Sequence, residues 1–403
     1  METEPYVNKA VPFKFNGAEL RLDLSHALFS SFDVDRGTKL LLKAVARDGA
    51  LERARKVLDE GCGVGVIGLS VAKAFPEAEV LLRDRDSLAV AFAERNRLSN
   101  RLKGRSAWKD PATGEERTAL PAPRSSWGLM GAGSALGPFD FVLSNLPAKA
   151  GGPVLAAFFA SLTGRGGGAP LLAEGGRAGV VIVEPLAAQA LSWIEEAGLS
   201  IASRSRGADH VVFVLEADPA SPGALAASAR AEAAAETAAA FPDAPLADLD
   251  LRSYLRSENR FRLADVAYRA KGFWGLPEFD TPGFGSAAAA ELGSRACAGC
   301  LARDVLVIDP GVGHFALWAA RVLGPDRVTA ASRDLLALAA AGANLAELPA
   351  SSRPAYRAVD ELGLDRLPDA SFDLIADFSA GVPELDRALP AWERAGRLLK
   401  RGG

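Results

Sequence analysis

The stretch KVLDEGCGVGVIGLS, residues 56–70, decides the fold of this chain. Its first residues, Lys56–Asp59, form the short apolar run that is typical of a buried strand, and Val66–Phe75 has the pattern of a helix. Three glycines lie between them, and glycine lets a backbone turn sharply and approach a ligand closely. The stretch therefore predicts a strand, a glycine-rich loop and a helix, which is how an α/β domain begins.

Strands and helices alternate along the rest of the first half. The further strands that we predict are Glu79–Arg83, Phe139–Ser144, Gly179–Glu184, Leu199–Arg204 and His210–Glu216, and the helices are Ser87–Leu102 and Leu186–Ala197. Alternation of this kind predicts a mainly parallel, doubly wound sheet. The last two strands leave no room for a helix between them, so we expect them to form an antiparallel hairpin that ends the sheet.

The length of 403 residues predicts about two or three domains. Between 218 and 250 the composition shifts to alanine, proline, serine and acidic residues, which indicates a linker with a candidate helix at Ala224–Ala239. We therefore expect a first domain over 1–217, made of a lead-in segment at 20–50 and a core at 51–217, and a second domain over 251–403.

The composition is that of a globular protein, with a formal net charge of −4. A negative overall charge gives no signal for binding a polyanion, so any contact with nucleic acid requires a local basic patch. The N-terminus has no basic segment ahead of an apolar one, and the sequence has no run of about 18 or more apolar residues. We expect a cytoplasmic protein without a membrane span.

The cysteines are Cys62, Cys297 and Cys300, a sparse and odd set that indicates a reducing compartment rather than a disulfide framework. The last two have the spacing of half a zinc site. The sequence has no second pair of this kind, and His210 and His314 lack matching spacing, so we predict no metal. No histidine lies beside a plausible nucleophile, which leaves triad chemistry without support.

The two halves carry similar motifs in the same order at nearly constant spacing, which predicts an internal tandem duplication. The matching pairs are Phe32-Asp33 with Phe279-Asp280, Gly37-Thr38 with Gly285-Ser286, Asp59–Gly63 with Asp309–Gly313, and Phe139-Asp140 with Phe372-Asp373. In the second half we predict strands at Val305–Asp309, Arg327–Ala331 and Phe372–Ala376, and a helix at Phe315–Leu323. The second half ends at a glycine-rich turn. In the first half, the turn at the corresponding place leads into the fifth strand. We therefore expect an incomplete second sheet and a chain that is a fragment.

The glycine-rich loop is a candidate cofactor site. Asp59, Gly61, Gly63 and Gly65 have the spacing D-x-G-x-G-x-G, and the helix N-terminus that follows can meet the carboxylate of a ligand. Asp84, at the end of the second strand, can accept hydrogen bonds from both hydroxyls of a ribose. This set suits S-adenosylmethionine (SAM), whose amino group needs an acidic or carbonyl partner.

Other occupants of this loop stay open, because Gly63–Gly68 also fits the G-x-G-x-x-G pattern of dinucleotide-binding loops. A nicotinamide or flavin nucleotide, or an empty structural loop, is the alternative to SAM. Asp59 and the predicted terminal hairpin favour SAM, and we include Asp110 among the predicted cofactor-binding residues.

A polar turn, Ser144–Ala148, follows the fourth strand. Together with the glycine loop and the segment Phe29–Leu41, this turn resembles the methyltransferase small domain family, typified by bacterial 16S ribosomal RNA guanine-N2 methyltransferases of class I. The resemblance covers about Leu28–Pro147. It implies a Rossmann-like core with a terminal antiparallel hairpin, and SAM as the methyl donor.

In that family the turn reads Asn-Pro-Pro-aromatic. The asparagine side-chain oxygen and the next backbone carbonyl accept hydrogen bonds from the target amine, and the aromatic ring stacks on the base. The resemblance therefore assigns the catalytic roles to Asn145, the carbonyl of Leu146 and Pro147, although these residues could instead only shape a turn. Ala148 stands in place of the aromatic residue. The candidates to replace that ring are Phe29, Phe32, Phe158 and Phe159.

The reaction that the resemblance implies is methyl transfer to an amine nitrogen, preferably on a base of structured RNA or a ribosomal subunit. A protein or small-molecule amine is one alternative, and a catalytically inactive RNA-binding or scaffold protein is another. A possible phosphate track consists of Arg83, Arg85, Arg95, Arg97, Arg101, Lys103, Arg105 and Lys109. A solvated helix face is the alternative interpretation of that cluster.

The second half also resembles this family but lacks what the chemistry needs. By the motif alignment, Phe315 stands in the place of Gly65, Ser332 replaces Asp84, and Phe378 replaces the catalytic asparagine. Members of the ribosomal RNA family pair one active copy with one degenerate copy, the degenerate one first. Here the order is reversed, and we expect only the first copy to bind the donor.

Overall fold

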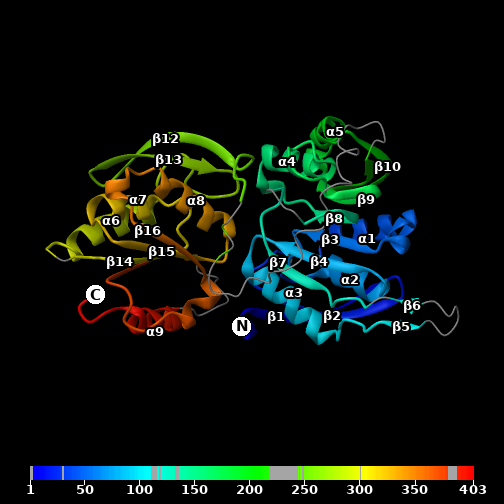
Figure 1. The fold of residues 1–403 in the computed structure, drawn as a ribbon, viewed down its shortest axis with the longest axis horizontal. Helices are drawn as coiled ribbons and strands as arrows, with labels where there is room; N and C mark the ends of the chain where they lie inside the picture. Colours follow the sequence, from blue (N-terminus) through cyan, green and yellow to red (C-terminus); the bar gives the residue numbers. More distant parts are fainter. Residues whose placement is uncertain are drawn as a thin grey trace. The chain divides into compact units, whose positions relative to one another are not determined.

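The computed structural model describes residues 3–29, 31–109, 116–117, 119–131, 136–217, 244, 246, 249–299, 301–379 and 388–403. It divides into two compact units, Glu2–Glu236 and Thr237–Gly403, each of which is described by itself (Figure 1). The division falls inside the segment predicted as a linker, whose candidate helix at Ala224–Ala239 lies outside the described residues. No helix in the described part of the chain is long and apolar enough to cross a membrane.

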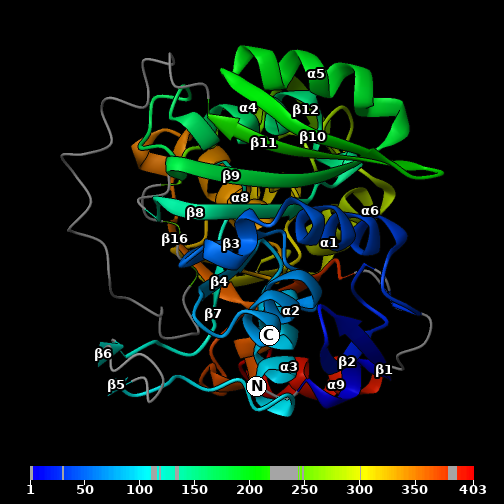
Figure 2. The ribbon, with the colours of Figure 1, turned by 90° about the vertical axis from the view of Figure 1, so that its right-hand side faces the viewer.

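The N-terminal unit is built on a seven-stranded sheet in the order β10-β11-β9-β8-β3-β4-β7, which Figure 2 shows from top to bottom. Its strands are β3 (Lys56–Glu60), β4 (Glu79–Asp84), β7 (Arg124–Trp127), β8 (Phe139–Asn145), β9 (Leu172–Val183), β10 (Leu199–Arg206) and β11 (His210–Ala217). The strands from β9 to β7 are parallel, whereas β11 is antiparallel to both β9 and β10. The predicted doubly wound sheet with a terminal antiparallel hairpin is confirmed.

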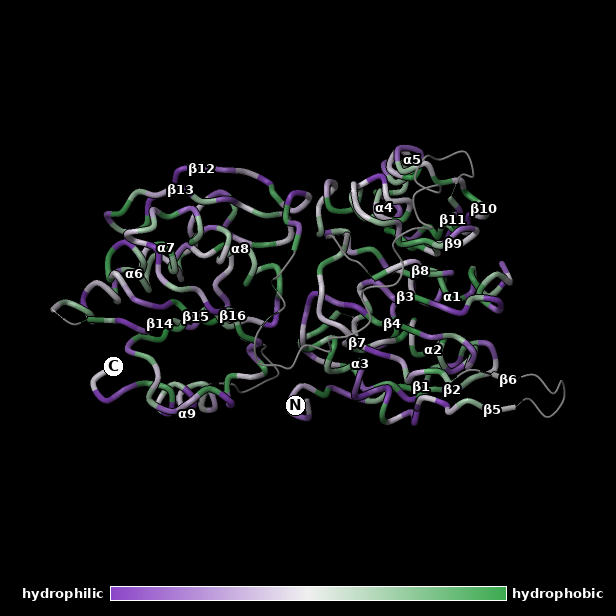
Figure 3. Tube along the Cα trace, in the orientation of Figure 1, coloured by the Kyte–Doolittle hydropathy of each residue, from purple (hydrophilic) through white to green (hydrophobic). Residues whose placement is uncertain are grey.

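Five helices cover the two faces of this sheet: α1 (Arg36–Asp48), α2 (Val66–Ala74), α3 (Ser87–Ser99), α4 (Gly152–Thr163) and α5 (Ala187–Glu196). Alternate residues of β9 show which helices lie on which face. Gly179 faces α1, where an added Cβ would lie 2.7 Å from Val45 Cγ1. Val180 belongs instead to the core that holds Phe158 and Phe159 of α4. Figure 3 shows the hydrophobic course of β8 through this core.

An N-terminal hairpin, β1 (Val7–Phe15) and β2 (Ala18–Ser25), packs against α2 and α3 and was not predicted. The fully buried Asn96 of α3 holds it in place. Its side-chain oxygen accepts from Asp23 N at 2.7 Å, and its amide donates to the carbonyls of Asp23 and Val64 at 3.0 and 2.9 Å. The hairpin is thereby tied to the glycine loop. A short ribbon, β5 (Trp108–Lys109) with β6 (Glu116–Arg117), follows α3.

Two element boundaries differ from prediction by three residues or more. Strand β9 begins at Leu172, seven residues before the predicted start, because two adjacent glycines, one with a positive φ of 71°, interrupt the apolar pattern without ending the pairing. Helix α3 ends at Ser99 rather than at Leu102, since Arg101 adopts a left-handed φ of 57° that a helix cannot continue through.

The C-terminal unit has a four-stranded parallel sheet in the order β16-β15-β14-β17 (Figure 1). Its strands are β14 (Asp304–Ile308), β15 (Arg327–Ser332), β16 (Ala355–Asp360) and β17 (Leu374–Asp377), and its hairpin is β12 (Leu255–Leu263) with β13 (Val266–Phe273). Its helices are α6 (Phe284–Ala296), α7 (His314–Val322), α8 (Leu335–Ala346) and α9 (Ala388–Leu398). The order repeats β7-β4-β3-β8 of the first unit.

The two units also repeat individual hydrogen bonds. Asn344 accepts from Lys271 N at 2.7 Å and donates to the carbonyls of Lys271 and Val312, as Asn96 does in the first unit. Asp140 accepts from two successive backbone amides at the start of β3, and Asp373 does the same at the start of β14. A shift of 248 residues relates Asn96 to Asn344. These matched contacts are what a duplication produces, and they support that interpretation.

The same contacts correct the motif alignment of the two loops by two residues. Gly65 and Gly313 are equivalent, because each is the left-handed residue, with φ of 88° and 94°, that immediately precedes a helix. The expectation that Phe315 stands in the place of Gly65 was therefore wrong. Asp309 occupies the place of Gly61, with φ of 53° against 76°. In letters, the D-x-G-x-G match favours the alignment of Asp59 with Asp309, and only the ends of the strands and the start of each helix show that Asp309 corresponds to Gly61.

Candidate cofactor and acceptor site

The glycine loop joins the end of β3 to the first turn of α2, and its glycines serve different purposes. A Cβ on Gly65 would lie 2.9 Å from Leu69 Cδ1 and 3.2 Å from Leu82 Cδ2, so close packing excludes a side chain there. A Cβ on Gly63, at a φ of 54°, would meet nothing within 4 Å. One side of the loop is therefore packed against the core and the other is open.

Asp84 closes this loop from the end of β4. Its Oδ2 accepts from Gly63 N at 2.9 Å, and its Oδ1 accepts from Asp86 N at 3.0 Å. Burial raises the pKa of Asp84 above its ordinary value, and the backbone amides of Asp86, Gly63 and Arg85, together with the charge of Arg85, oppose that rise. A carboxylate has about four acceptor sites, so three backbone donors leave room for a ligand hydroxyl. The position and remaining capacity of Asp84 are compatible with its predicted ribose contact.

Asp59 lies deeper than Asp84 and is fully buried. Its Oδ2 accepts from Gly68 N at 2.7 Å, in the first turn of α2, whereas its Oδ1 has no hydrogen-bond partner among the described residues. Burial is the largest cause that raises the pKa of Asp59 to about 7, and the charges of Asp84 and Glu60 add to the rise. Asp59 thus fixes the helix to the loop, and its contact with a cofactor amino group stays a prediction.

A buried ion pair lies beside these carboxylates. Arg83 is 3% exposed, and its Nε donates to Glu60 Oε1 at 3.1 Å while another of its nitrogens donates to Leu129 O at 2.8 Å. Its inclusion in a surface phosphate track was therefore wrong. Asp59, Glu60 and Asp84 bring three carboxyl groups to this edge of the sheet against the charges of Arg83 and Arg85, and burial raises the pKa of all three. The site favours a cationic ligand.

The rest of the predicted phosphate track is largely neutralised by neighbouring acids. Arg95 pairs with Asp23 at 2.6 Å, Arg97 pairs with Glu94 at 2.6 Å, and Arg105 pairs with Glu77. Arg101 and Lys103 are exposed, and the side chain of Lys109 lies outside the described residues. This arrangement favours the interpretation of a solvated helix face.

Asn145 ends β8 at the same carboxyl edge of the sheet. Its side-chain amide donates to Asp35 Oδ2 and to Thr38 Oγ1, both at 3.0 Å. Asp35 caps α1, since the same Oδ2 accepts from Thr38 N at 3.1 Å. A carboxylate can only accept, so the nitrogen of Asn145 must face Asp35. The oxygen of Asn145 therefore points away and has no donor among the residues that the structure describes.

The turn after Asn145 presents backbone rather than side chains. Leu146 is 2% exposed and packs in the core, while its N–H donates to Val181 O at 3.0 Å. Its carbonyl accepts no hydrogen bond in the described chain. Pro147 and Ala148 are exposed. Two acceptors, Asn145 Oδ1 and Leu146 O, thus stand free at adjacent positions.

The proposed substitutes for the missing aromatic ring fall into two classes. Phe158 and Phe159 are fully buried in the core of α4, so neither can stack on a ligand, and their candidacy was wrong. Phe29 and Phe32 are 76% and 64% exposed. They precede Asp35 in the segment that leads into α1, which places them near the acceptor turn in sequence.

The equivalent edge of the C-terminal unit is filled by its own residues. Asp309 Oδ1 accepts from Ser332 Oγ at 2.6 Å, so a short internal bond occupies the place where Gly61 and Asp84 stand in the first unit. Phe378 follows β17, where Asn145 follows β8, and its ring lies 5.5 Å from that of Phe315. The positions of Asp84 and Asn145 are thus taken by a serine and a phenylalanine in this unit.

Sequence reasoning assigned no role to Asp35 and Thr38, although both lie in the segment that carries the family resemblance. Their spacing, D-x-x-T before a helical pattern, is the signature of an N-cap and could have located the start of α1. Asp110 and Cys300 lie outside the described residues. In the described part of the chain, no group of three or more His, Cys, Asp or Glu could hold a metal ion.

Comparison with known proteins agrees with this geometry. Residues 19–120 match the family described as methyltransferase small domain. Two curated relatives, both described as ribosomal RNA small subunit methyltransferase C, come from Psychromonas ingrahamii and Actinobacillus succinogenes. They are 35% identical over 96 residues and 41% identical over 78 residues, which is 24% and 19% of this chain. The chain spans about a quarter of the length of these relatives, 26% and 22%.

A solved structure resembles the chain over most of its length. It is the T. Thermophilus 16S rRNA N2 G1207 methyltransferase (RsmC) in complex with AdoMet and guanosine. The TM-score is 0.56 at 18% identity, covering 96% of this chain and 85% of that one. This likeness shows the class I methyltransferase fold.

The raised pKa of Asp59 makes a prediction about stability. An acid whose pKa rises from 3.8 unfolded to about 7 folded stabilises the protein below about pH 4, and that contribution is lost as the pH rises through about 7. Asp59→Asn keeps an oxygen for Gly68 N–H but cannot ionise. Between these pH values, the free energy of unfolding of the unaltered protein should fall relative to that of the variant, by up to about 1.4 kcal/mol per pH unit.

Urea unfolding at a series of pH values measures this difference. Glu60 and Asp84 titrate in both proteins, so the difference between the curves reports Asp59 together with its coupling to these two acids. Parallel curves for the two proteins would show that Asp59 ionises at its ordinary pKa and is not desolvated as described.

Proposed function

We propose that the chain, whose residues 19–120 form a methyltransferase small domain, is a SAM-dependent methyltransferase acting on an amine nitrogen. The observation that carries the proposal is the fixed orientation of Asn145. Asp35 and Thr38 hold its amide nitrogen, so its oxygen and the carbonyl of Leu146 are left as a pair of acceptors. A pair of acceptors fits an NH₂ group, which has two hydrogens to donate.

The electrostatics of the loop favour SAM over a dinucleotide. SAM carries a sulfonium and an ammonium group, and both are attracted by the carboxyl groups of Asp59, Glu60 and Asp84. A pyrophosphate would be repelled by the same groups. The residues that surround the loop therefore fit SAM.

Within this site the loop from Gly61 to Gly65 would lie against the methionine part of SAM, and the N-terminus of α2 would meet its carboxylate. Asp84 would accept from the ribose hydroxyls. We also assign Asp59 and Asp110 to the cofactor site, Asp59 through the charge it brings beneath the loop. When bound, SAM supplies a methyl group on a positively charged sulfur, which an amine lone pair attacks directly.

Positioning is the main contribution of the protein to such a reaction. Asn145 Oδ1 and Leu146 O would each accept one hydrogen of the target amine, which directs its lone pair along the edge of the sheet. Pro147 would fix the backbone after these acceptors. Asp84 and the glycine loop lie at this same carboxyl edge, where doubly wound sheets bind ligands. Donor and acceptor would therefore meet there.

For the acceptor we propose a base of structured RNA, as in a ribosomal subunit. The names of the relatives and the guanosine bound to the T. Thermophilus enzyme support this choice. The exposed Phe29 and Phe32 are the candidates for stacking on the base, because Ala148 cannot. The loss of the aromatic at Ala148 favours one alternative, a smaller amine that needs no stacking platform.

A first prediction concerns Asp84. Asp84→Ala removes hydrogen bonds to charged oxygen worth about 1.5–3 kcal/mol each, so SAM affinity should fall roughly ten- to hundredfold. Isothermal titration calorimetry measures the change. Ser332→Ala, at the equivalent position of the second unit, is the matched control and should leave the affinity unchanged. A folded Asp84→Ala protein that binds SAM normally would remove Asp84 from the site.

A second prediction separates chemistry from donor binding. Asn145→Ala should leave SAM affinity within a few-fold of the parental value while turnover falls about a hundredfold or more. Asn145→Asp should be nearly as harmful, because its carboxylate would face that of Asp35. Transfer of label from SAM to ribosomal subunits or bulk RNA of a strain that lacks the gene measures turnover.

Asp35 gives this test a positioning control. Asp35→Asn offers a donor as well as an acceptor, so the amide of Asn145 can reverse, and turnover should fall without loss of SAM affinity. Asp33→Asn, which changes an exposed carboxylate two residues away that binds Lys39, should change neither quantity. Parental turnover in Asn145→Ala would mean that Asn145 only shapes the turn.

A further inference from the structure

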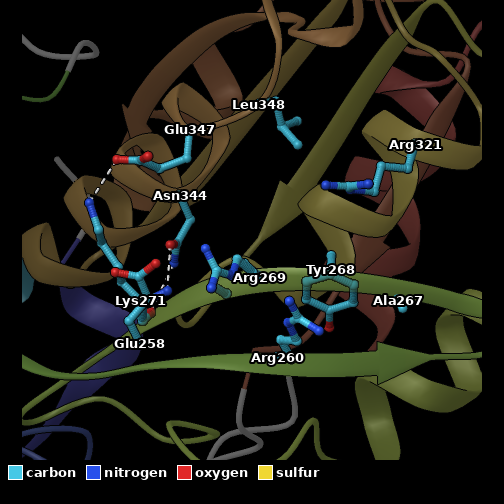
Figure 4. A pocket seen from close by; sticks show the side chains of 11 residues that line it. Glu258, Arg260, Ala267, Tyr268, Arg269, Lys271, Arg321, Asn344, Glu347 and Leu348 are labelled. Atoms are coloured by element: carbon cyan, nitrogen blue, oxygen red, sulfur yellow. Dashed lines mark hydrogen bonds and ion pairs between the residues drawn. The ribbon is translucent and has the colours of Figure 1, made fainter.

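We propose that a cavity in the C-terminal unit binds phosphate groups of the RNA acceptor, an inference that rests on the RNA substrate of the proposed function. The cavity has a volume of about 620 Å³ and lies between the hairpin β12–β13 and the helices α7 and α8. Its cationic side chains are Arg260 of β12, Arg269 and Lys271 of β13, and Arg321 of α7 (Figure 4).

The two acids of the cavity neutralise only one end of it. Glu347 Oε1 lies 2.7 Å from Lys271 Nζ, and Glu258 is the residue directly opposite Lys271 in the hairpin. Hydrogen bonding from Lys271 lowers the pKa of Glu347 below its ordinary value, which keeps Glu347 ionised at neutral pH. The lining thus has an excess of two positive charges, and all of that excess is on arginines.

The arginines themselves are unusual in their placement. Arg260 is directly opposite Arg269 in the antiparallel register, and like charges at such positions destabilise a sheet. In the described part of the chain, neither these two side chains nor Arg321 has a hydrogen-bond or ion-pair partner. An anion between the guanidinium groups would relieve the repulsion. Phosphate suits this position, because a guanidinium can donate two parallel hydrogen bonds to it.

The N-terminal unit provides an internal comparison at the shift of 248 residues. There, Pro12 is opposite Arg21, so that hairpin has a single arginine where the second has two. Asp23 stands where Lys271 stands, and it forms an ion pair with Arg95. The fold and the asparagine contacts are the same in both units. What differs is the charge, so the basic character of the second hairpin is not a requirement of the fold.

The spacing of the cations favours a strand of phosphates over one small anion. Arg260 and Arg269 are neighbours on the hairpin, whereas Arg321 comes from α7 and lines the cavity apart from them (Figure 4). All three are exposed and accessible to a large ligand. A nucleic-acid backbone presents successive phosphates and can meet several of these groups at once. The C-terminal unit would then hold the RNA whose base reacts at the N-terminal unit.

The test is a binding experiment that does not require methyl transfer. Fluorescence anisotropy of a labelled RNA hairpin with the full chain should show binding that weakens as KCl increases. Arg269→Glu should weaken RNA binding at least tenfold and make the dependence on salt shallower. This variant places opposite charges at Arg260 and position 269, so without RNA its unfolding temperature should equal or exceed the parental value. Its SAM affinity should be unchanged.

A second test uses the double variant Arg260→Gln with Arg269→Gln. Its matched control is the double variant Arg295→Gln with Arg303→Gln. The control removes the same charge from exposed, ion-paired arginines of the same unit outside the cavity. Only the first double variant should lose RNA affinity. Equal losses in both would reduce the site to a general charge effect and overturn the proposal.

Other outcomes separate this proposal from the proposed function. If RNA binds and is methylated normally by Arg269→Glu, the cavity is not the RNA site, while the proposed function stands. If the parental chain binds no RNA but still binds SAM, both the RNA acceptor and this inference fail. If inorganic phosphate protects the chain from thermal unfolding and RNA does not bind, the cavity is a small-anion site and the proposal is overturned.

Discussion

The hydrogen bond from Asn145 to Asp35 connects two segments that are 110 residues apart in sequence. It joins the end of β8 to the cap of α1, and it fixes which atom of the amide faces the open edge of the sheet. The rest of the site depends on this constraint, because a reversed amide would present a donor to an amine that also donates. The sheet brings the glycine loop and Asp84 to the same edge, so the orientation of one side chain decides whether that edge can hold an acceptor as well as a cofactor.

The two units show one scaffold with different side chains at the equivalent edge of the sheet. Both keep the strand order, the left-handed glycine that precedes the helix, and the asparagine that holds the hairpin. The first keeps an open loop with clustered carboxyl groups. In the second, Asp309 and Ser332 bond to each other and aromatic side chains fill the position of Asn145. The second hairpin is more basic than the first, because Arg260 and Lys271 stand where the first hairpin has Pro12 and Asp23.

Much of the fold could be predicted from the sequence, because parallel strands buried on both faces have short apolar runs that end at glycine or aspartate. The strands β3, β4 and β14 and the terminal hairpin follow from that pattern. The loop alignment could not be settled by letters, since Asp59 and Asp309 both begin a D-x-G-x-G match although they lie at different points of the strand. The burial of Arg83 could not be predicted from the sequence either. Its side chain points into the unit and pairs with Glu60, which a cluster of basic residues along the chain does not reveal. Asp35 was within reach of prediction as a helix cap, whereas its bond to Asn145 required the tertiary structure.

Only the first unit should bind SAM. Calorimetric titration of the full chain with SAM is the decisive experiment, because the stoichiometry does not depend on the identity of the acceptor. We expect one equivalent of SAM per chain. Two equivalents would contradict the internal occupation of the second loop by Asp309 and Ser332, and the absence of binding would contradict the fit of the acidic first loop to a cationic cofactor.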